Sequence, residues 1–337
     1  MIEKRRERKD QHIENYLKSQ SLTNNLLTDV YIDHRALADI SLDEIDTSIE
    51  FLGRKISMPL MVNAMTGGGE AGTDINEDLS SICESLNIPM AVGSEAIAID
   101  DPGSRESFSL IKDKDLIKIG NMGSEKSIED FTFAADLIGA DIMQVHLNMA
   151  QELVMPEGDR DFRGIRANIK NLCQNLKTPI IVKETGAGIS KEVAADLIDL
   201  GVKYIDVSGK GGTNFVEIED LRDMETDYSD LYDWGIPTAK AIIDVRSVSD
   251  DIFIIGSGGL KTAMDVVKSI IIGADMAAVS GEALKYLLHG GYEACEDYLK
   301  DLKQKMKIIM CLLGVKNIKE LKKVDYKLVG RLKELVE

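Results

Sequence analysis

Short apolar runs recur along the chain, and each is followed by a segment with helical periodicity. Each run is a continuous β-branched or methionine-rich stretch, which is typical of parallel strands buried on both faces. The eight runs cover residues 59–65, 90–94, 117–123, 141–148, 179–186, 204–212, 252–259 and 275–281. This pattern predicts eight strands that run in parallel.

The segments between the runs have the pattern of amphipathic helices. Residues 190–201 are SKEVAADLIDLG, in which Ser190 is the expected N-cap and Gly201 the expected C-cap. Residues 261–274 follow the same plan. The alternation of strands and helices therefore predicts an α/β protein built from βαβ units.

Eight βα units fit a TIM (β/α)8 barrel, and the alternative is a doubly wound open sheet. We favour the barrel because eight units complete one closed circuit and because polar residues end nearly every run. Residues 59–291 would form it. Residues 1–58, a charged helix with short strand-like pieces, would close the barrel. The C-terminal segment, residues 292–337, would form two helices at 292–314 and 317–336 that pack on the barrel. All three parts would belong to a single domain.

Polar and glycine residues gather at the ends of the runs, where a barrel places its ligand site. The sequence GSGG at 256–259 and the pair Ser280 and Gly281 end the seventh and eighth runs. Barrels often bind phosphate there, through backbone N–H groups and a helix N-terminus. A tight turn also explains such glycines, but their place on these two strands favours a phosphate site.

Lys183 ends the fifth run. It is a candidate Schiff-base nucleophile or a cation facing an anionic cofactor ring. An ion pair with Glu184 is the structural alternative. Successive side chains of a strand point to opposite faces, which argues against that pair.

The fourth run ends in a dense polar set, His146, Asn148, Gln151 and Glu152. A single carboxylate beside amide groups suits Mg²⁺, which takes one or two carboxylates together with substrate phosphates. Glu152 could instead be an ordinary acidic residue at a helix start, and His146 could be a core histidine. The following loop, 153–163, is polar and contains Pro and Gly, which favours a mobile lid.

The chain of 337 residues carries a net charge of −18, which disfavours binding to nucleic acid or to an anionic membrane. Against this background the basic residues Arg8, Lys9 and His12 stand out, although a solvated helix face also explains them. The four cysteines lack metal-site spacing and the N-terminus lacks a signal-peptide pattern, so we expect a cytoplasmic protein.

The assembled motifs resemble the type 2, flavin-dependent isopentenyl-diphosphate isomerase family over nearly the whole chain. The ordered set is specific, although each motif alone is not. It comprises RKDxH (8–12), HRAL (34–37), AMTGG (64–68), VGS (92–94), GNMGS (120–124), HLNxxQE with PEGDRDF (146–162), VKETGAG (182–188), GKGGTNF (209–215), WGIPTA (234–239) and GSGG (256–259).

The resemblance implies FMN, active in its reduced form, together with Mg²⁺, NAD(P)H as the reductant of the flavin, and a homo-oligomer such as a tetramer or octamer. The candidate catalytic residues are His146, Asn148, Gln151 and Lys183. Glu152 would bind the metal, and Arg8, Lys9, His12, Ser94 and Gln151 would bind the diphosphate substrate. FMN would be held by Met65, Thr66, Gly67, Gly68, Ser94, Asn121, Lys183, Ser208, Thr213, Gly256, Ser257, Gly258, Gly259, Ser280 and Gly281.

One position departs from the family pattern. Many members have an Arg two residues after the Ser of VGS, which helps to bind diphosphate, and this chain has Ala96 there. Arg105 and Arg160 are the candidates to replace it. The main alternative function is an FMN-dependent barrel oxidoreductase of the 2-hydroxy-acid oxidase kind, and a further one is a non-catalytic barrel that binds a phosphorylated ligand.

Overall fold

The computed structural model describes residues 2–19, 24–69, 71–222 and 226–337, so Met1 and residues 20–23 of the expected N-terminal extension lie outside it. Eight parallel strands close into a barrel in the order β10-β11-β4-β5-β6-β7-β8-β9. The predicted TIM barrel is confirmed, and each expected run contains one strand. The strands are β4 (Leu60–Val62), β5 (Met90–Ala91), β6 (Lys118–Gly123), β7 (Ile142–Leu147), β8 (Ile180–Glu184), β9 (Tyr204–Asp206), β10 (Phe253–Gly256) and β11 (Met276–Val279).

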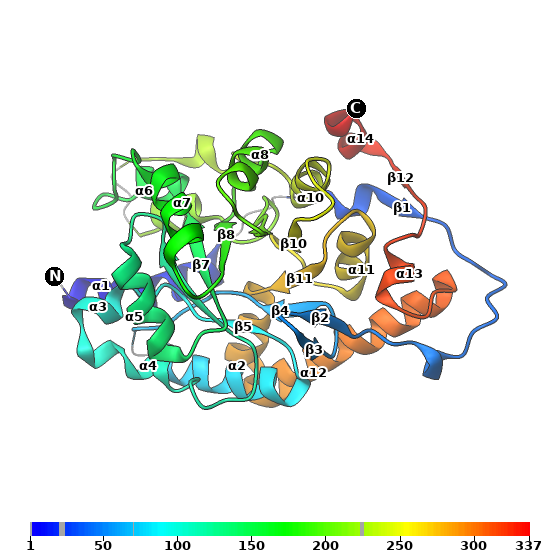
Figure 1. The fold of residues 1–337 in the computed structure, drawn as a ribbon, viewed down its shortest axis with the longest axis horizontal. Helices are drawn as coiled ribbons and strands as arrows, with labels where there is room; N and C mark the ends of the chain where they lie inside the picture. The colour runs from blue at the N-terminus through cyan, green and yellow to red at the C-terminus, as the bar shows by residue number, and fades with distance from the viewer. Residues whose placement is uncertain (1, 20–23, 70, 223–225) are drawn as a thin grey trace.

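Helices surround the barrel on its outer face (Figure 1). Ser190 caps α8 by accepting the N–H of Val193 at 3.3 Å, as the sequence predicts, and Thr262 caps α11 in a reciprocal capping box with Asp265. These caps fix where each helix leaves its loop. The outer helices are α2 (Gly72–Leu86), α5 (Ile128–Ile138), α7 (Ile165–Asn175), α8 (Lys191–Asp199), α10 (Thr238–Arg246), α11 (Ala263–Ile271) and α12 (Gly281–Leu313), and short helices α3 (Ala96–Asp100), α4 (Glu106–Ser109), α6 (Met149–Val154) and α9 (Phe215–Asp220) lie in the loops.

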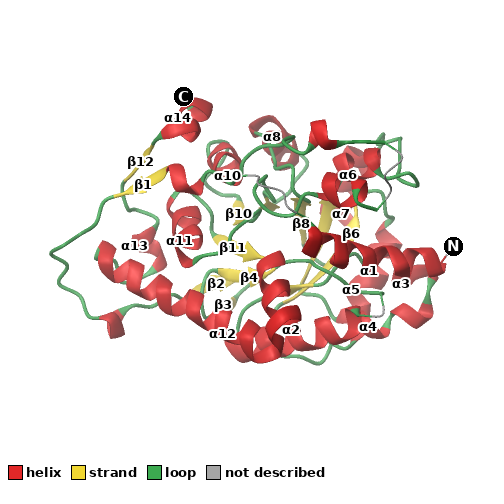
Figure 2. Ribbon diagram, turned by 180° about the vertical axis from the view of Figure 1, so that it is seen from behind, coloured by secondary structure: helices red, strands yellow, loops and turns green. Residues whose placement is uncertain are grey.

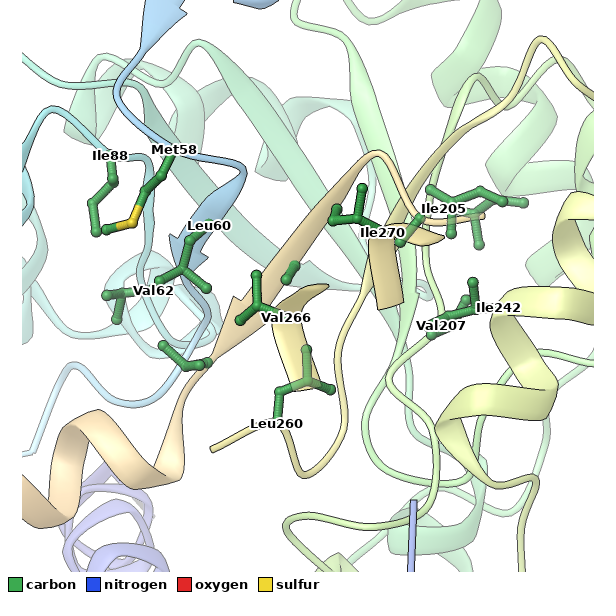
Figure 3. Packing of buried hydrophobic residues seen from close by; sticks show 14 of the residues in the cluster. Met58, Leu60, Val62, Ile88, Ile205, Val207, Ile242, Leu260, Val266 and Ile270 are labelled. Carbon is green, nitrogen blue, oxygen red and sulfur yellow. The ribbon is translucent and has the colours of Figure 1, made fainter. Parts of the chain in front are cut away.

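The main core lies between the strands and these helices (Figure 3). Leu60 and Val62 of β4 belong to it, whereas Met61 belongs to a second cluster inside the barrel. This alternation follows from the two-residue period of a strand. The barrel is therefore filled with side chains rather than hollow.

A hairpin covers the N-terminal end of the barrel. It consists of β2 (Ile49–Phe51) and β3 (Arg54–Ile56), which pair in antiparallel fashion. The Phe51 ring lies 5.0 Å from the ring of Phe253 and 6.1 Å from that of Tyr204, between centroids, and both of these residues begin barrel strands. The apolar side chains of the hairpin, such as the buried Phe51 and Ile56, seal this end, so the open end is the one with the polar residues.

On the side of the molecule away from the N-terminus, β1 (Val30–Ile32) pairs in antiparallel fashion with β12 (Tyr326–Leu328), which lies near the C-terminus (Figure 1). The prediction of one helix over 317–336 is wrong, because the segment divides into α13 (Ile318–Leu321), β12 and α14 (Gly330–Val336). Pairing with β1 overrides the local helical preference. Within the described residues, no helix is long and apolar enough to cross a bilayer.

The first helix, α1 (Ile2–Lys18), contacts α3 and α9, which both follow barrel strands on the open side (Figure 2). Arg6 binds Asp101 next to α3, with Nε 2.7 Å from Oδ2. The amide of Asn15 donates to the carbonyl of Ile218 in α9 at 3.2 Å. Contacts at both of its ends thus hold α1 against the open end of the barrel.

Candidate active site

A cavity of about 990 Å³ occupies the open end of the barrel. All eight strands or the loops directly after them contribute to its wall, and α1 closes one side. A cavity at the C-terminal ends of the strands is where barrel enzymes place their ligands. The described residues therefore offer one site large enough for a cofactor and a substrate together.

Most of the residues singled out in the sequence line this cavity. They are Arg8, Lys9, His12, Met65, Thr66, Ser94, Asn121, His146, Asn148, Gln151, Glu152, Lys183, Ser208, Thr213, Ser257, Gly258, Gly259, Ser280 and Gly281. They come from segments up to 273 positions apart, as the difference between 8 and 281 shows. The barrel thus gathers the candidate residues in one place, and their individual roles remain proposals.

Three candidate glycines lie outside the cavity wall. At Gly67 an added Cβ would fall on the ring of Phe108, and at Gly68 it would fall on Ile97. At Gly256 it would lie 2.9 Å from Cδ1 of Ile242 in α10. These glycines allow close packing behind the site, and no contact of theirs with a ligand follows from the structure.

The loops after β9 and β10 pack against each other through the backbone of glycine residues. At Gly258 and Gly259 an added Cβ would collide with the carbonyl oxygens of Gly209 and Gly211. The backbone φ is +108° at Gly258 and +76° at Gly259, a region that favours glycine. These four glycines form a stretch of backbone without side chains, called the backbone cradle below, and all but Gly211 line the cavity. The first residues of α12, which begins at Gly281 without a side-chain cap, line the same cavity.

Lys183 lies inside the barrel, where it is 6% exposed and lines the cavity. Its Nζ donates to the carbonyl of Glu184 at 2.6 Å, and its register partner on β9 is Asp206. Burial lowers the pKa of Lys183, and Asp206 opposes that shift. The Glu184 carboxylate instead accepts backbone N–H groups of its own loop, including that of Gly186 at 2.6 Å.

His146 is at the end of β7, with Nδ1 2.7 Å from Oδ1 of Asn121. Burial and the nearby Lys183 lower the pKa of His146 to about 3. The imidazole is therefore neutral at physiological pH. It lines the cavity as a neutral hydrogen-bonding group and not as a cation.

Glu152 lies in α6, directly after β7. Its Oε1 accepts from Nδ2 of Asn148 at 2.8 Å, and its Oε2 accepts the backbone N–H of Asp159 at 2.9 Å. Among the described residues no three His, Cys, Asp or Glu side chains form a metal-binding group. Glu152 therefore fits a Mg²⁺ that takes its remaining oxygens from water and substrate phosphates, as Mg²⁺ commonly does.

Glu219 lies behind the cavity wall, where it holds two of the lining residues, and the sequence analysis does not single it out. It is 1% exposed, and its Oε1 lies 2.9 Å from Nε2 of His12 and accepts from Nε2 of Gln151 at 2.8 Å. Burial acts against ionisation, but the hydrogen bonds from His12 and Gln151 and the charge of Arg222 lower the pKa of Glu219. Glu219 thus joins α1, α6 and α9.

The loop 153–163 is tied down on both sides. Arg222 holds Glu157 through two bonds of 2.6 and 2.7 Å, which lower the pKa of Glu157 to about 2. Nη1 of Arg8 lies 3.3 Å from Sδ of Met155. The loop and α1 together form one part of the cavity wall.

Neither candidate replacement for the family Arg reaches the cavity wall. Arg105 donates to the carbonyl of Ala98 at 2.9 Å and stacks on Phe133, and Arg160 donates to backbone carbonyls of its own loop. Lys126, in the turn after β6, does line the cavity. Nothing in the sequence pattern singles out Lys126, because a Lys in a turn is usually a solvated surface residue.

The residues present fit FMN. The backbone cradle and the uncapped start of α12 offer backbone N–H groups to a phosphate. The buried Lys183 offers a cation inside the same cavity, and the polar strand ends offer hydrogen bonds. An anionic, planar, hydrogen-bonding group of this kind matches the chemistry of the wall.

Comparison with solved structures shows the same fold in flavin enzymes. A flavocytochrome b2 variant with sulfite bound superposes with a TM-score of 0.72 at 18% identity, covering 96% of this chain and 84% of that chain. A mandelate oxidase variant with a monooxide FMN adduct has a TM-score of 0.64 at 15% identity, covering 91% and 90%. At these identities the likeness concerns the fold alone.

Sequence comparison is more specific. The model of the FMN-dependent dehydrogenase family matches residues 140–327. The isopentenyl-diphosphate delta-isomerase of Bacillus licheniformis is 40% identical over 329 residues, covering 97% of this chain and 94% of that protein. The enzyme of the same name from Pyrococcus horikoshii is 35% identical over 346 residues, covering 97% and 93%. The chain therefore belongs to the type 2, FMN-dependent isopentenyl-diphosphate delta-isomerases.

Proposed function

We propose that this enzyme uses reduced FMN and Mg²⁺ to interconvert isopentenyl diphosphate and dimethylallyl diphosphate. The observation that carries the proposal is the single cavity that joins three features. These are a backbone cradle for a phosphate, a buried lysine, and a cationic edge on α1 beside a carboxylate. Together they suit a flavin placed next to a diphosphate.

The flavin phosphate would lie on the backbone cradle at Gly258 and Gly259 and at the start of α12. Lys183 would face the ring system and favour an anionic reduced form, because its charge is buried and therefore weakly screened. Reduced FMN would supply the acid and the base that move a proton between two carbons of the alkene. NAD(P)H would serve only to reduce the flavin.

The diphosphate would lie toward α1. Arg8, Lys9 and His12 line that side of the cavity, and Nζ of Lys9 donates to the carbonyl of Ser94 at 2.7 Å. Lys126 adds a cation on the same wall, in the absence of the family Arg at Ala96. A local set of cations is needed because the chain as a whole carries a charge of −18.

Mg²⁺ bound to Glu152 would offset further negative charge on the diphosphate. Asn148 holds Oε1 of Glu152 in place, and Gln151, one position earlier in α6, faces the cavity. The loop 153–163 and α1 would exclude water from the alkene, so that a developing positive charge is not quenched. These side chains bind and orient, and none of them needs to change its oxidation state.

A product assay tests this function. Purified enzyme would receive isopentenyl diphosphate, FMN, Mg²⁺ and a small amount of NADPH, and dimethylallyl diphosphate and remaining NADPH would both be measured. Isomerisation predicts many product molecules for each NADPH consumed. Consumption of NADPH in step with substrate would instead favour a net oxidoreductase of the 2-hydroxy-acid oxidase kind.

A further inference from the structure

A chain of hydrogen bonds crosses the barrel interior from Asp206 on β9 to His146 on β7. Nδ2 of Asn63 donates to Oδ2 of Asp206 at 2.6 Å, and Nε2 of Gln144 donates to Oδ1 of Asn63 at 2.8 Å. Nδ2 of Asn121 donates to Oε1 of Gln144 at 2.8 Å, and Oδ1 of Asn121 lies 2.7 Å from Nδ1 of His146. Three amides thus connect a carboxylate to an imidazole.

The direction of this chain is fixed at its carboxylate end. Oδ2 of Asp206 accepts, so Asn63 must turn its NH2 group toward Asp206. The backbone N–H of Ala64 donates to Oδ1 of Asn63 at 2.9 Å, which independently identifies that atom as the oxygen. Gln144 must then donate to Asn63, and its own oxygen must accept from the next amide.

The same logic reaches His146. Because Asn121 uses its NH2 group on Gln144, it turns its oxygen toward the imidazole. An amide oxygen only accepts, so Nδ1 of His146 must carry the proton. The other ring nitrogen, Nε2, is then unprotonated, and it is the nitrogen available to a ligand in the cavity that His146 lines.

Asp206 is held firmly enough to act as the anchor. It is 0% exposed, Oδ1 accepts the backbone N–H of Ser208 at 3.2 Å and the hydroxyl of Ser257, and Lys183 is its neighbour in register. Burial raises the pKa of Asp206, and the charge of Lys183 opposes the rise. Because the N–H of Ala64 already fixes the NH2 group of Asn63 on Oδ2, a proton on Asp206 could sit only on Oδ1, where the Ser257 hydroxyl would have to turn and accept it, and Oδ2 accepts from Asn63 in either state.

We propose that Gln144 and Asp206 are positioning residues that hold His146 as the tautomer with a protonated Nδ1 and a bare Nε2. Gln144 is 0% exposed, and it acts only through Asn63 and Asn121. His146 consequently offers a hydrogen-bond acceptor to an N–H or O–H group of the bound ligand. It does not donate a proton to the diphosphate and does not pair with it as a cation.

This inference deepens the proposed function, since the ligand that meets Nε2 would be the flavin or the substrate. The groups that lower the pKa of His146, after burial, are the cations Lys183, Lys9 and Lys126. All three disfavour a second proton on the ring. The neutral ring can still carry its one proton on either nitrogen, and the chain of amide hydrogen bonds places that proton on Nδ1.

Nitrogen NMR of the full-length, FMN-loaded enzyme with ¹⁵N-labelled histidine tests the proposal. The chain has four histidines, and His146→Asn identifies the signals of His146 by their loss. We expect Nδ1 to show the shift of a protonated imidazole nitrogen and Nε2 that of a bare one. A protonated Nε2 in the unaltered enzyme would overturn the proposal.

Two substitutions of Gln144 distinguish a specific role in orienting His146 from a general loss of structure. Gln144→Met removes both links, so Asn121 can turn and the His146 signals should move toward the other tautomer. Gln144→Glu keeps an acceptor for Asn121 and should restore the original pattern. Gln304→Met, on the exposed face of α12, is the matched control and should change nothing. Unchanged His146 signals in Gln144→Met would contradict the proposed role.

The outcomes distinguish this inference from the proposed function. The NMR signals require no turnover, so the expected tautomer in an enzyme without isomerase activity would remove the proposed function and leave the inference standing. A protonated Nε2 in an active isomerase would do the reverse. If Gln144→Met does not fold, the unaltered enzyme and Gln144→Glu still decide the question.

Discussion

Glu95 allows a prediction about stability that can be worked out from the structure. It follows β5, is 0% exposed, and accepts the backbone N–H of Asn121 on Oε2 at 2.9 Å. Within the described chain, its Oε1 has no hydrogen-bond partner. Burial raises the pKa of Glu95 from 4.5 to about 8, although the Asn121 bond and Lys9 act in the opposite direction.

The sign of the effect follows from proton linkage. Below a pH of 4.5 the folded and unfolded states both hold the proton, so Glu95 adds no pH dependence. Between 4.5 and about 8 the unfolded state releases the proton while the folded state keeps it, so stability falls as the pH rises. At about 1.4 kcal/mol for each pH unit, reduced near the two pKa values where a state is only partly ionised, the free energy of unfolding should fall by roughly 3.5 kcal/mol between about pH 5 and pH 8.

Glu95→Gln removes this titration and keeps an oxygen for the N–H of Asn121. Urea unfolding of both proteins across that pH range should show the variant gaining stability relative to the unaltered chain as the pH rises. Glu129→Gln, on the exposed surface of α5, is the matched control. Two curves that stay parallel for Glu95→Gln would refute the assignment of a buried, protonated carboxyl.

Three further substitutions test the cavity, and one substitution outside the cavity is a control. Gly259→Ala should destabilise the protein by about 1–3 kcal/mol and reduce FMN retention, because φ is +76° and the Cβ meets the Gly211 carbonyl. Gly53→Ala has a similar φ of +73° with open space around it, so in thermal unfolding it should cost about 1 kcal/mol only, and equal losses would argue against the interlocked loops. Glu152→Gln should raise the Mg²⁺ concentration needed for half-maximal activity about tenfold or more, and an unchanged metal titration would remove Glu152 from the metal site. Lys183→Ala should weaken FMN binding or activity at least tenfold, measured by flavin absorbance and turnover, and a fully active variant would leave Lys183 a structural role.

The barrel could be predicted from sequence because its strands are buried on both faces and therefore stand out as apolar runs. The ends of these runs also located most of the cavity wall, since a barrel brings all strand ends together. Asn63, Gln144 and Asp206 were overlooked although they lie inside the runs. A polar residue at an inward position of an apolar run is the signal that would have found them.

Other features depend on contacts between distant segments. Glu219 becomes a site residue only because α1 brings His12 to it across 207 positions. Strand β12 forms only because β1, nearly 300 positions earlier, supplies a partner for Leu328 and its neighbours. Local composition indicates an acidic loop around Glu219 and a helix around Leu328. The local sequence of each segment carries no information about its distant partner.

The rate of isomerisation with oxidised and with reduced flavin decides whether FMN takes part in the chemistry. Under anaerobic conditions, the enzyme with isopentenyl diphosphate, Mg²⁺ and FMN would be compared with FMN oxidised and with FMN reduced by dithionite, and dimethylallyl diphosphate would be measured over time. Product should form only with reduced FMN, and the flavin should stay reduced as product accumulates. Equal rates with oxidised and reduced FMN would contradict a role of FMN in the chemistry.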